Sequence, residues 1–276
     1  MELTKEILED IIKQFAEEGK IFSNEAQFQF ELAWALREYK DKKGNKLFSD
    51  INDKIMLEHL STVENEKMYT DIVVRVGKKY YPIELKYKTA DKTIEYQKGN
   101  IVKITYLQGA HDDASYDFLK DIKRLEQIVI DKEFTPFDGE ESYCVKKGFA
   151  IIISNEPKIW GDGVRDISKS PWHDFFLFSF DKSNHNTDRV GIMGKLGWNK
   201  KGENSWLNEE GNDDSRGGRA KPIILNHSYS MKWEPYMESE KPFDTFTKGG
   251  FKEIKYGKTR KAHPIKYVVV EVKETE

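Results

Sequence analysis

The sequence predicts an α/β fold in which a mixed β-sheet is flanked by helices. Three observations support this prediction. Two amphipathic segments open the chain, a β-hairpin and a third amphipathic segment follow, and a continuous apolar run comes after them. Helices followed by a hairpin, a helix and a central strand are typical of a single sheet with helices packed on it.

Three segments repeat apolar residues at the spacing of an amphipathic helix. The first follows Thr4, a candidate N-cap, and ends near Gly19. The second covers about residues 24–39, with Asn24 and Gln27 spaced for a capping box. The third covers about residues 112–130. All three are expected to pack one face against the sheet.

A hairpin is predicted over residues 71–86. Apolar residues alternate with polar ones on both sides of Gly77-Lys78, which supplies turn chemistry. If these two residues form the loop, Asp71 lies directly opposite Glu84, about 5 Å away at Cβ. A longer turn would change this register. Two carboxylates at that distance repel each other unless a cation lies between them.

The remaining strands are predicted from apolar runs. Residues 54–60 alternate as a short strand before the hairpin, and residues 148–154 form a continuous apolar run that suits a buried central strand. A further strand is predicted at 175–180, and late strands at 222–226 and 265–273. The apolar piece 101–107 has no assignment.

Length and composition limit the class of protein. A chain of 276 residues with 38% hydrophobic content can form one domain with elaborations. The net charge of −3 gives no overall attraction to nucleic acid, so any such surface must be local. The single cysteine, Cys144, excludes an internal disulfide framework. The start lacks the pattern of a signal peptide, and no apolar run is long enough to cross a bilayer, so we expect a soluble cytoplasmic protein.

The hairpin carries the residues with the most chemical interest. Asp71, Glu84, the Leu85 backbone carbonyl and water would form an oxygen-rich site that suits Mg²⁺ or Mn²⁺. Lys86 shares the face of Glu84 because side chains two apart in a strand point the same way. It could stabilise charge on a phosphate or lower the pKa of an attacking water, and the sequence leaves its role as a base open. The alternative is a solvated hairpin face.

An acidic residue two positions before a lysine is a weak signal in this chain, because several such triplets occur. Glu271-Val272-Lys273 is the nearest rival to Glu84-Leu85-Lys86, but no helix follows it. The first triplet is favoured by its setting: a strand that opens with Asp71, a helix with Glu31 before it, and a helix with Tyr116 and Lys120 after it.

In this order the residues resemble the PD-(D/E)XK nuclease superfamily, which includes many restriction endonucleases. The resemblance covers about residues 20–155, and Thr70 stands where the name-giving proline would be. It implies a restriction-endonuclease-like core: a central four-stranded mixed sheet in αβββαβ order, with 148–154 as the fourth strand. Residues 1–155 would then be the nuclease-like core, and 156–276 a C-terminal extension packing on it.

The resemblance also implies Mg²⁺-dependent phosphodiester hydrolysis. Asp71 and Glu84 would be metal ligands, Lys86 the catalytic lysine, and Glu31 a helix glutamate that reaches the metal through water. Tyr116, Lys120 and Lys123 could contact nucleic acid, which we expect to be DNA, although a lysine-bearing helix face is often only solvated. The alternative function is a nuclease-fold protein that binds nucleic acid or a protein partner without cutting. The oligomeric state stays open, a homo-oligomer included.

Overall fold

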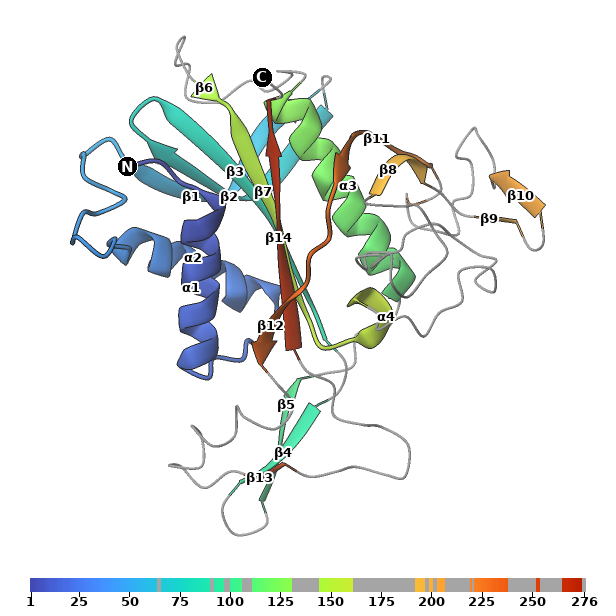
Figure 1. The fold of residues 1–276 in the computed structure, drawn as a ribbon, viewed down its shortest axis with the longest axis horizontal. Coiled ribbons are helices and arrows are strands. Elements are labelled where there is room, and N and C mark those ends of the chain that lie inside the picture. The colour runs from blue at the N-terminus through green and yellow to red at the C-terminus, as the bar shows by residue number, and fades with distance from the viewer. Residues whose placement is uncertain are drawn as a thin grey trace.

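A computed structural model describes the following parts of the chain: residues 1–63, 66–89, 92–96, 100–105, 111–130, 144–160, 192–196, 199–200, 203–206, 219, 221–237, 252–253 and 265–274. Its core is one large sheet with helices on both faces (Figure 1). The mixed α/β class that the sequence predicts is therefore confirmed. Within the described ranges, no helix has both the length and the apolar character needed to cross a membrane.

The two N-terminal helices begin at the residues that the sequence predicts. Helix α1 covers Lys5–Glu17, and the Thr4 hydroxyl accepts a hydrogen bond from the backbone N–H of Ile7. Helix α2 covers Glu25–Glu38, and Asn24 Oδ1 accepts from the backbone N–H of Gln27 at 2.8 Å. The Gln27 side chain in turn accepts from the backbone N–H of Ser23, one residue before the cap. Side-chain caps of this kind satisfy N–H groups that have no partner within the helix.

The large sheet has seven strands in the spatial order β1-β2-β3-β7-β14-β12, with β6 also paired to β3. Their bounds are β1 Lys54–Val63, β2 Glu66–Val76, β3 Lys79–Lys88, β6 Cys144–Val145, β7 Lys147–Ser154, β12 Glu234–Met237 and β14 Ile265–Lys273. Strand β3 is parallel to β6 and β7, while all other neighbours in the sheet are antiparallel.

The sheet is larger than the predicted four strands, because β14 and β12 extend it beyond β7. The elements α2, β1, β2, β3, α3 (His111–Val129) and β7 nevertheless follow one another in the predicted αβββαβ order, with two short strands inserted before α3 and the short strand β6 inserted between α3 and β7. The strand predicted at 54–60 continues to residue 63, and the one at 265–273 is confirmed.

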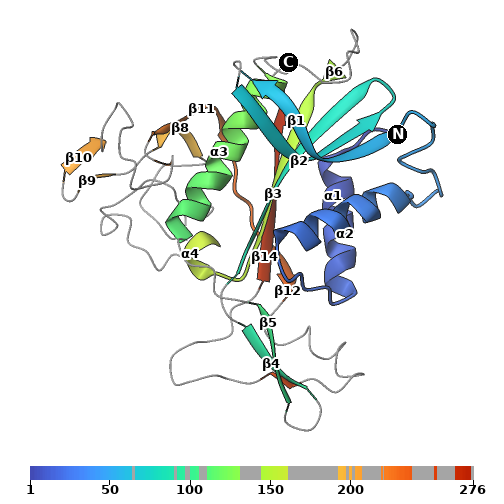
Figure 2. The same cartoon turned by 180° about the vertical axis from the view of Figure 1, so that it is seen from behind.

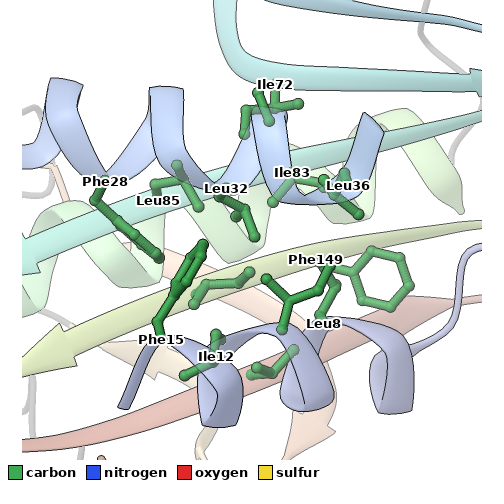
Figure 3. Packing of buried hydrophobic residues seen from close by; sticks show 14 of the residues in the cluster. Leu8, Ile12, Phe15, Phe28, Leu32, Leu36, Ile72, Ile83, Leu85 and Phe149 are labelled. Atoms are coloured by element: carbon green, nitrogen blue, oxygen red, sulfur yellow. The ribbon is translucent and has the colours of Figure 1, made fainter. Parts of the chain in front are cut away.

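Helices cover both faces of the sheet, so the fold has three layers (Figures 1 and 2). Alternate residues of strands β2, β3, β7 and β14 enter two separate apolar cores. On the face of α1 and α2, residues such as Phe15, Leu32, Ile83 and Phe149 pack together, as Figure 3 shows. On the other face, α3 packs between the sheet and strand β11.

Shorter elements lie outside the large sheet. Strand β8 (Ile192–Leu196) pairs with β11 (Ile223–Tyr229) beside α3, and β9 (Asn199–Lys200) pairs with β10 (Glu203–Trp206). Strands β4 (Lys92–Tyr96), β5 (Asn100–Thr105) and β13 (Lys252–Glu253) form a small separate sheet. The short helix α4 covers Pro157–Trp160. The unassigned run 101–107 thus begins within β5, and the strand predicted at 175–180 lies outside the described residues.

Pro82 lies in the middle of β3, where its missing N–H would leave a gap in a ladder. The pairing accommodates it with a register shift: Tyr80 pairs with Val145, but Ile83 pairs with Phe149, so one extra residue stands opposite Pro82. Gly148 makes close packing possible at the same place. A Cβ there would lie 2.9 Å from a methyl of Leu125 in α3 and 3.1 Å from Pro82 Cγ.

Asp53 fixes the loop before β1 to the hairpin turn. Its Oδ2 accepts from the backbone N–H groups of Ser49 and Asp50, and its Oδ1 accepts from that of Gly77, all at 2.8 Å. Burial alone would raise the pKa of Asp53, but these three donors outweigh burial and lower it.

We expect Asp53→Asn to destabilise the protein at neutral pH by about 1–3 kcal/mol. Both oxygens of Asp53 face backbone N–H donors, so the NH₂ group of asparagine would meet a donor whichever way the amide is turned. A lowered pKa means that the stabilisation is present above the ordinary aspartate pKa of 3.8 and is lost as pH falls through the lower folded value. Urea unfolding at several pH values checks this. A difference in the free energy of unfolding between variant and wild type that grows towards acid pH would contradict this expectation.

Candidate functional site

Strands β2 and β3 separate at the position that the sequence singled out. Their pairing runs from Val76 opposite Lys79 to Ile72 opposite Ile83, which is the register predicted for a Gly77-Lys78 turn. Beyond this point β2 continues with β1 and β3 continues with β7. The next residue of β2 is Asp71 and the next residue of β3 is Glu84, and the two are not paired as the sequence predicted, because the ladder ends at Ile72 and Ile83. We call the place where the two strands part the fork.

Side chains take up the backbone groups that the fork leaves without a strand partner. The Leu85 N–H donates to Asp71 Oδ2 at 2.6 Å, and the Tyr87 N–H donates to Glu25 Oε2 at 2.8 Å. On the other strand, the Asp71 carbonyl accepts from Gln29 Nε2 at 2.6 Å. Buried backbone groups need partners, so these bonds fix the first turns of α2 at the fork.

Lys86 lies beside the fork with oxygen atoms around its ammonium group. Its Nζ donates to the Leu85 carbonyl at 2.8 Å and lies 3.0 Å from Asp121 Oδ2 and 3.7 Å from Glu25 Oε1. Burial alone would lower the pKa of Lys86, but the charges of Asp121, Glu25 and Asp71 raise it above its ordinary value. Lys86 is therefore an ammonium ion at neutral pH.

Glu84 is buried beside Arg124 of α3. Only 2% of Glu84 is exposed, and within the described part of the chain its Oε1 accepts no hydrogen bond. This oxygen lies 3.7 Å from Arg124 Nη2, which donates to the Tyr69 carbonyl, while Arg124 Nη1 donates to Asp121 Oδ1 at 3.1 Å. Burial, together with the charge of Asp121, raises the pKa of Glu84 well above its usual range.

The other carboxyls of the group are also costly to ionise. Burial is the main cause that raises the pKa values of Glu25, Asp71 and Asp121. The negative charge of Asp71 also raises the pKa of Glu84. Glu84 and Lys86 both contact α3, which confirms that they share a face of β3. The fork therefore gathers more acidic groups than its surroundings can easily keep charged.

The residues of the fork fit a divalent cation in two respects. Four carboxylates and two cations meet at the fork: Glu25, Asp71, Glu84 and Asp121, with Lys86 and Arg124. When all six side chains are ionised, this group has a net charge of two negative charges. Glu84 Oε1 is buried without a hydrogen bond. Within the described ranges no three His, Cys, Asp or Glu side chains are arranged to hold a metal, so two carboxylates, a carbonyl and water would have to form the ligand set.

The glutamate that reaches the fork from α2 is Glu25, which the sequence analysis did not single out. Glu31 instead pairs with Lys20 Nζ at 3.0 Å. Helical geometry explains the difference. Gln29 lies one turn after Glu25 and also contacts the fork. Glu31 lies two residues after Gln29, which places it on the opposite side of the helix from Gln29. The structure does not bring Glu31 together with Asp71 and Glu84.

The three residues predicted to contact nucleic acid lie on α3 in different surroundings. Tyr116 is buried, and its hydroxyl donates to the Lys221 carbonyl at 2.7 Å. Lys123 Nζ lies 3.3 Å from Glu126. Lys120 is exposed. Contact with nucleic acid stays a prediction for all three, and Lys120 is the one whose exposure leaves it available.

The sequence analysis also missed Asp121 and Arg124. A signal was present for Asp121, which is buried beside the stripe of Phe118, Ile122 and Leu125 that faces the core, where a charged side chain needs a partner. Arg124 is only half-buried, so its position on the helix gave no such signal. Their partners, Lys86 and Glu84, lie far away in the chain, so the sequence alone could not identify them.

Comparisons with protein-family models, curated proteins and solved structures find no match to this chain. The function therefore has to be argued from the fork itself.

Proposed function

We propose that this chain is a metal-dependent nuclease with a restriction-endonuclease-like core that hydrolyses phosphodiester bonds in DNA. The observation that supports it best is the fork, where Asp71 and Glu84 follow the last residue pair of β2 and β3 and Lys86 lies on the face of Glu84. The order of α2, β1, β2, β3, α3 and β7 agrees with the resemblance to PD-(D/E)XK nucleases.

Asp71, Glu84 and the Leu85 carbonyl are the groups that would hold Mg²⁺ or Mn²⁺, because hard divalent cations prefer oxygen ligands. Bound there, the ion supplies an activated water and offsets negative charge on the phosphate. Within the described residues, Glu84 Oε1 accepts no hydrogen bond, and the pKa values of Asp71 and Glu84 are raised; both observations favour this assignment, since a cation would compensate charges that burial now disfavours.

The chain itself would contribute positive charge at the scissile phosphate. Lys86 Nζ is held by three oxygen atoms, so it serves as a fixed ammonium ion that stabilises the charge developing on the phosphate oxygens. The Leu85 N–H holds Asp71 in place, which orients the carboxylate before any ligand binds.

The proposal is tested by incubating the protein with supercoiled plasmid, linear duplex and single strands. We expect cleavage with Mg²⁺ or Mn²⁺, none with EDTA, and none with Asp71→Ala. Cleavage that survives EDTA or the Asp71 substitution would overturn the proposal, as would the absence of cleavage with every substrate and metal.

A second candidate function is a nuclease-fold protein that binds nucleic acid or a protein partner without cutting. It is favoured because two of the expected metal-binding groups already have hydrogen-bond partners within the protein. The Leu85 carbonyl accepts from Lys86, and Asp71 accepts from the Leu85 N–H. Electrophoretic mobility shifts with DNA in the absence of any cleavage would select this candidate.

The helix glutamates provide a matched pair of substitutions. We expect Glu25→Gln to lower the cleavage rate by about tenfold, because Glu25 contacts Lys86 and the backbone at the fork. Glu31→Gln should leave the rate within about twofold of wild type, because Glu31 pairs with Lys20 instead. Initial rates on plasmid measure both. The reverse ranking would restore Glu31 as the helix glutamate of the site.

A further inference from the structure

Two charged side chains of helix α3 each contact one of the predicted catalytic residues of β3, Lys86 and Glu84. Asp121 is 3% exposed and lies 3.0 Å from Lys86 Nζ through Oδ2. Arg124, one turn later, lies 3.7 Å from Glu84. The two α3 residues also bind each other at 3.1 Å. The four side chains therefore form one connected ionic group between helix and strand.

The Arg124 guanidinium joins three elements at the fork. It donates to the Tyr69 carbonyl of β2 at 2.7 Å, binds Asp121 of α3, and lies beside Glu84 of β3. A planar guanidinium with several donors fixes its acceptors in direction as well as distance. Arg124 thereby holds Asp121 in the orientation that Oδ2 needs to reach Lys86.

Helix α3 is itself anchored on its other side. Glu126 accepts hydrogen bonds from the backbone N–H groups of Asn226 and His227 and from the Tyr229 hydroxyl, at 3.0 to 3.1 Å. A charge on a helix fixed in this way can place a partner more accurately than one on a loop.

We propose that Asp121 is a positioning residue that holds the Lys86 ammonium group at the fork, with Arg124 fixing Asp121 in turn. This inference rests on the proposed nuclease function and assigns to Asp121 no contact with substrate. Without the Asp121 charge, Lys86 keeps its hydrogen bond to the Leu85 carbonyl and its longer contact to Glu25, at 3.7 Å. We then expect its ammonium group to shift away from the position of the phosphate.

The test uses full-length protein labelled with ¹³Cε-lysine, in which the signal lost in Lys86→Met identifies Lys86. We expect Asp121→Asn, which keeps the side-chain volume, to shift the Lys86 signal and to lower kcat for plasmid cleavage by about 10–100-fold with KM nearly unchanged. Asp117→Asn is the matched control, because Asp117 lies one turn earlier on α3 and pairs with Arg219. It should change neither the Lys86 signal nor kcat.

A second variant covers the case in which Asp121→Asn does not fold. Asp121→Glu keeps the charge but moves it by one carbon–carbon bond, about 1.5 Å, so kcat should still fall if position matters. An unchanged kcat in a folded Asp121 variant overturns the inference while wild-type cleavage keeps the proposed function intact. A wild type that cleaves no DNA with any metal overturns the proposed function, and the inference with it.

Discussion

Lys86→Met is expected to lower kcat for DNA cleavage by about 10²–10³-fold, the usual effect of removing one fixed group that stabilises charge in the transition state. Methionine fills a similar volume but carries no charge. The Lys86 Nζ is held by the Leu85 carbonyl and Asp121, so the substitution removes a positive charge that is fixed in position. Single-turnover cleavage of a labelled duplex measures the effect.

Lys88→Met is the control for this substitution. Lys88 lies two residues further along β3 on the same face and is also partly buried, near Asp117 and Asp113 of α3. Its removal should change kcat by no more than about threefold. An equal loss in both variants would mean that the positive charge of this surface, and not the position of Lys86, supports cleavage.

The hairpin was the most predictable part of the site, because its geometry is local. Gly77 and Lys78 form the turn, and a two-residue turn fixes the register of the pairs that follow it, from Val76–Lys79 to Ile72–Ile83. The ladder ends before Asp71 and Glu84, so the direct pairing predicted for these two residues does not form. The same holds for the caps Thr4 and Asn24, whose side chains bond to residues three positions away.

The rest of the site could not be predicted because it depends on packing between distant segments. Asp121 and Arg124 meet β3 only when α3 crosses the sheet, and Glu25 meets it only because α2 begins at the fork. Helical spacing places Glu25 and Glu31 on different sides of α2, but it does not say which side faces the fork. The direction of α2 over the sheet makes that choice.

The extent of the sheet has a similar explanation. The apolar run of β14 identifies it as a buried strand, but its place beside β7 joins residues more than 100 positions apart. This pairing makes β7 the neighbour of both β3 and β14, which agrees with its continuous apolar sequence. The C-terminal strands therefore complete the sheet that carries the fork.

Glu84→Gln is expected to abolish metal-dependent cleavage and, at the same time, to stabilise the metal-free protein at neutral pH. Burial and the charge of Asp121 raise the pKa of Glu84, so the folded protein keeps this proton to higher pH than the unfolded chain does. The wild type therefore loses stability as pH rises from the ordinary glutamate pKa of 4.5 to the raised folded value. Glutamine has nearly the same shape and avoids this loss.

Thermal unfolding in EDTA at about pH 5 and about pH 8 measures the effect, and we expect the advantage of the variant to be larger at the higher pH. The increase in Tm should be a few degrees, since 1 kcal/mol corresponds to about 2–4 °C for a domain of this size. Millimolar Mg²⁺ should raise the Tm of the wild type only, because the variant lacks a ligand for the ion.

Glu126→Gln is the matched comparison, because Glu126 is an equally buried glutamate whose oxygens accept bonds from two backbone N–H groups and the Tyr229 hydroxyl. Its amide would bring an NH₂ group against these donors, so this variant should be destabilised, by about 1–3 kcal/mol. Opposite signs for the two substitutions would separate a carboxylate held for binding a cation from one held for stability. Destabilisation by both would contradict the assignment, because it would mean that the Glu84 carboxylate also stabilises the metal-free protein.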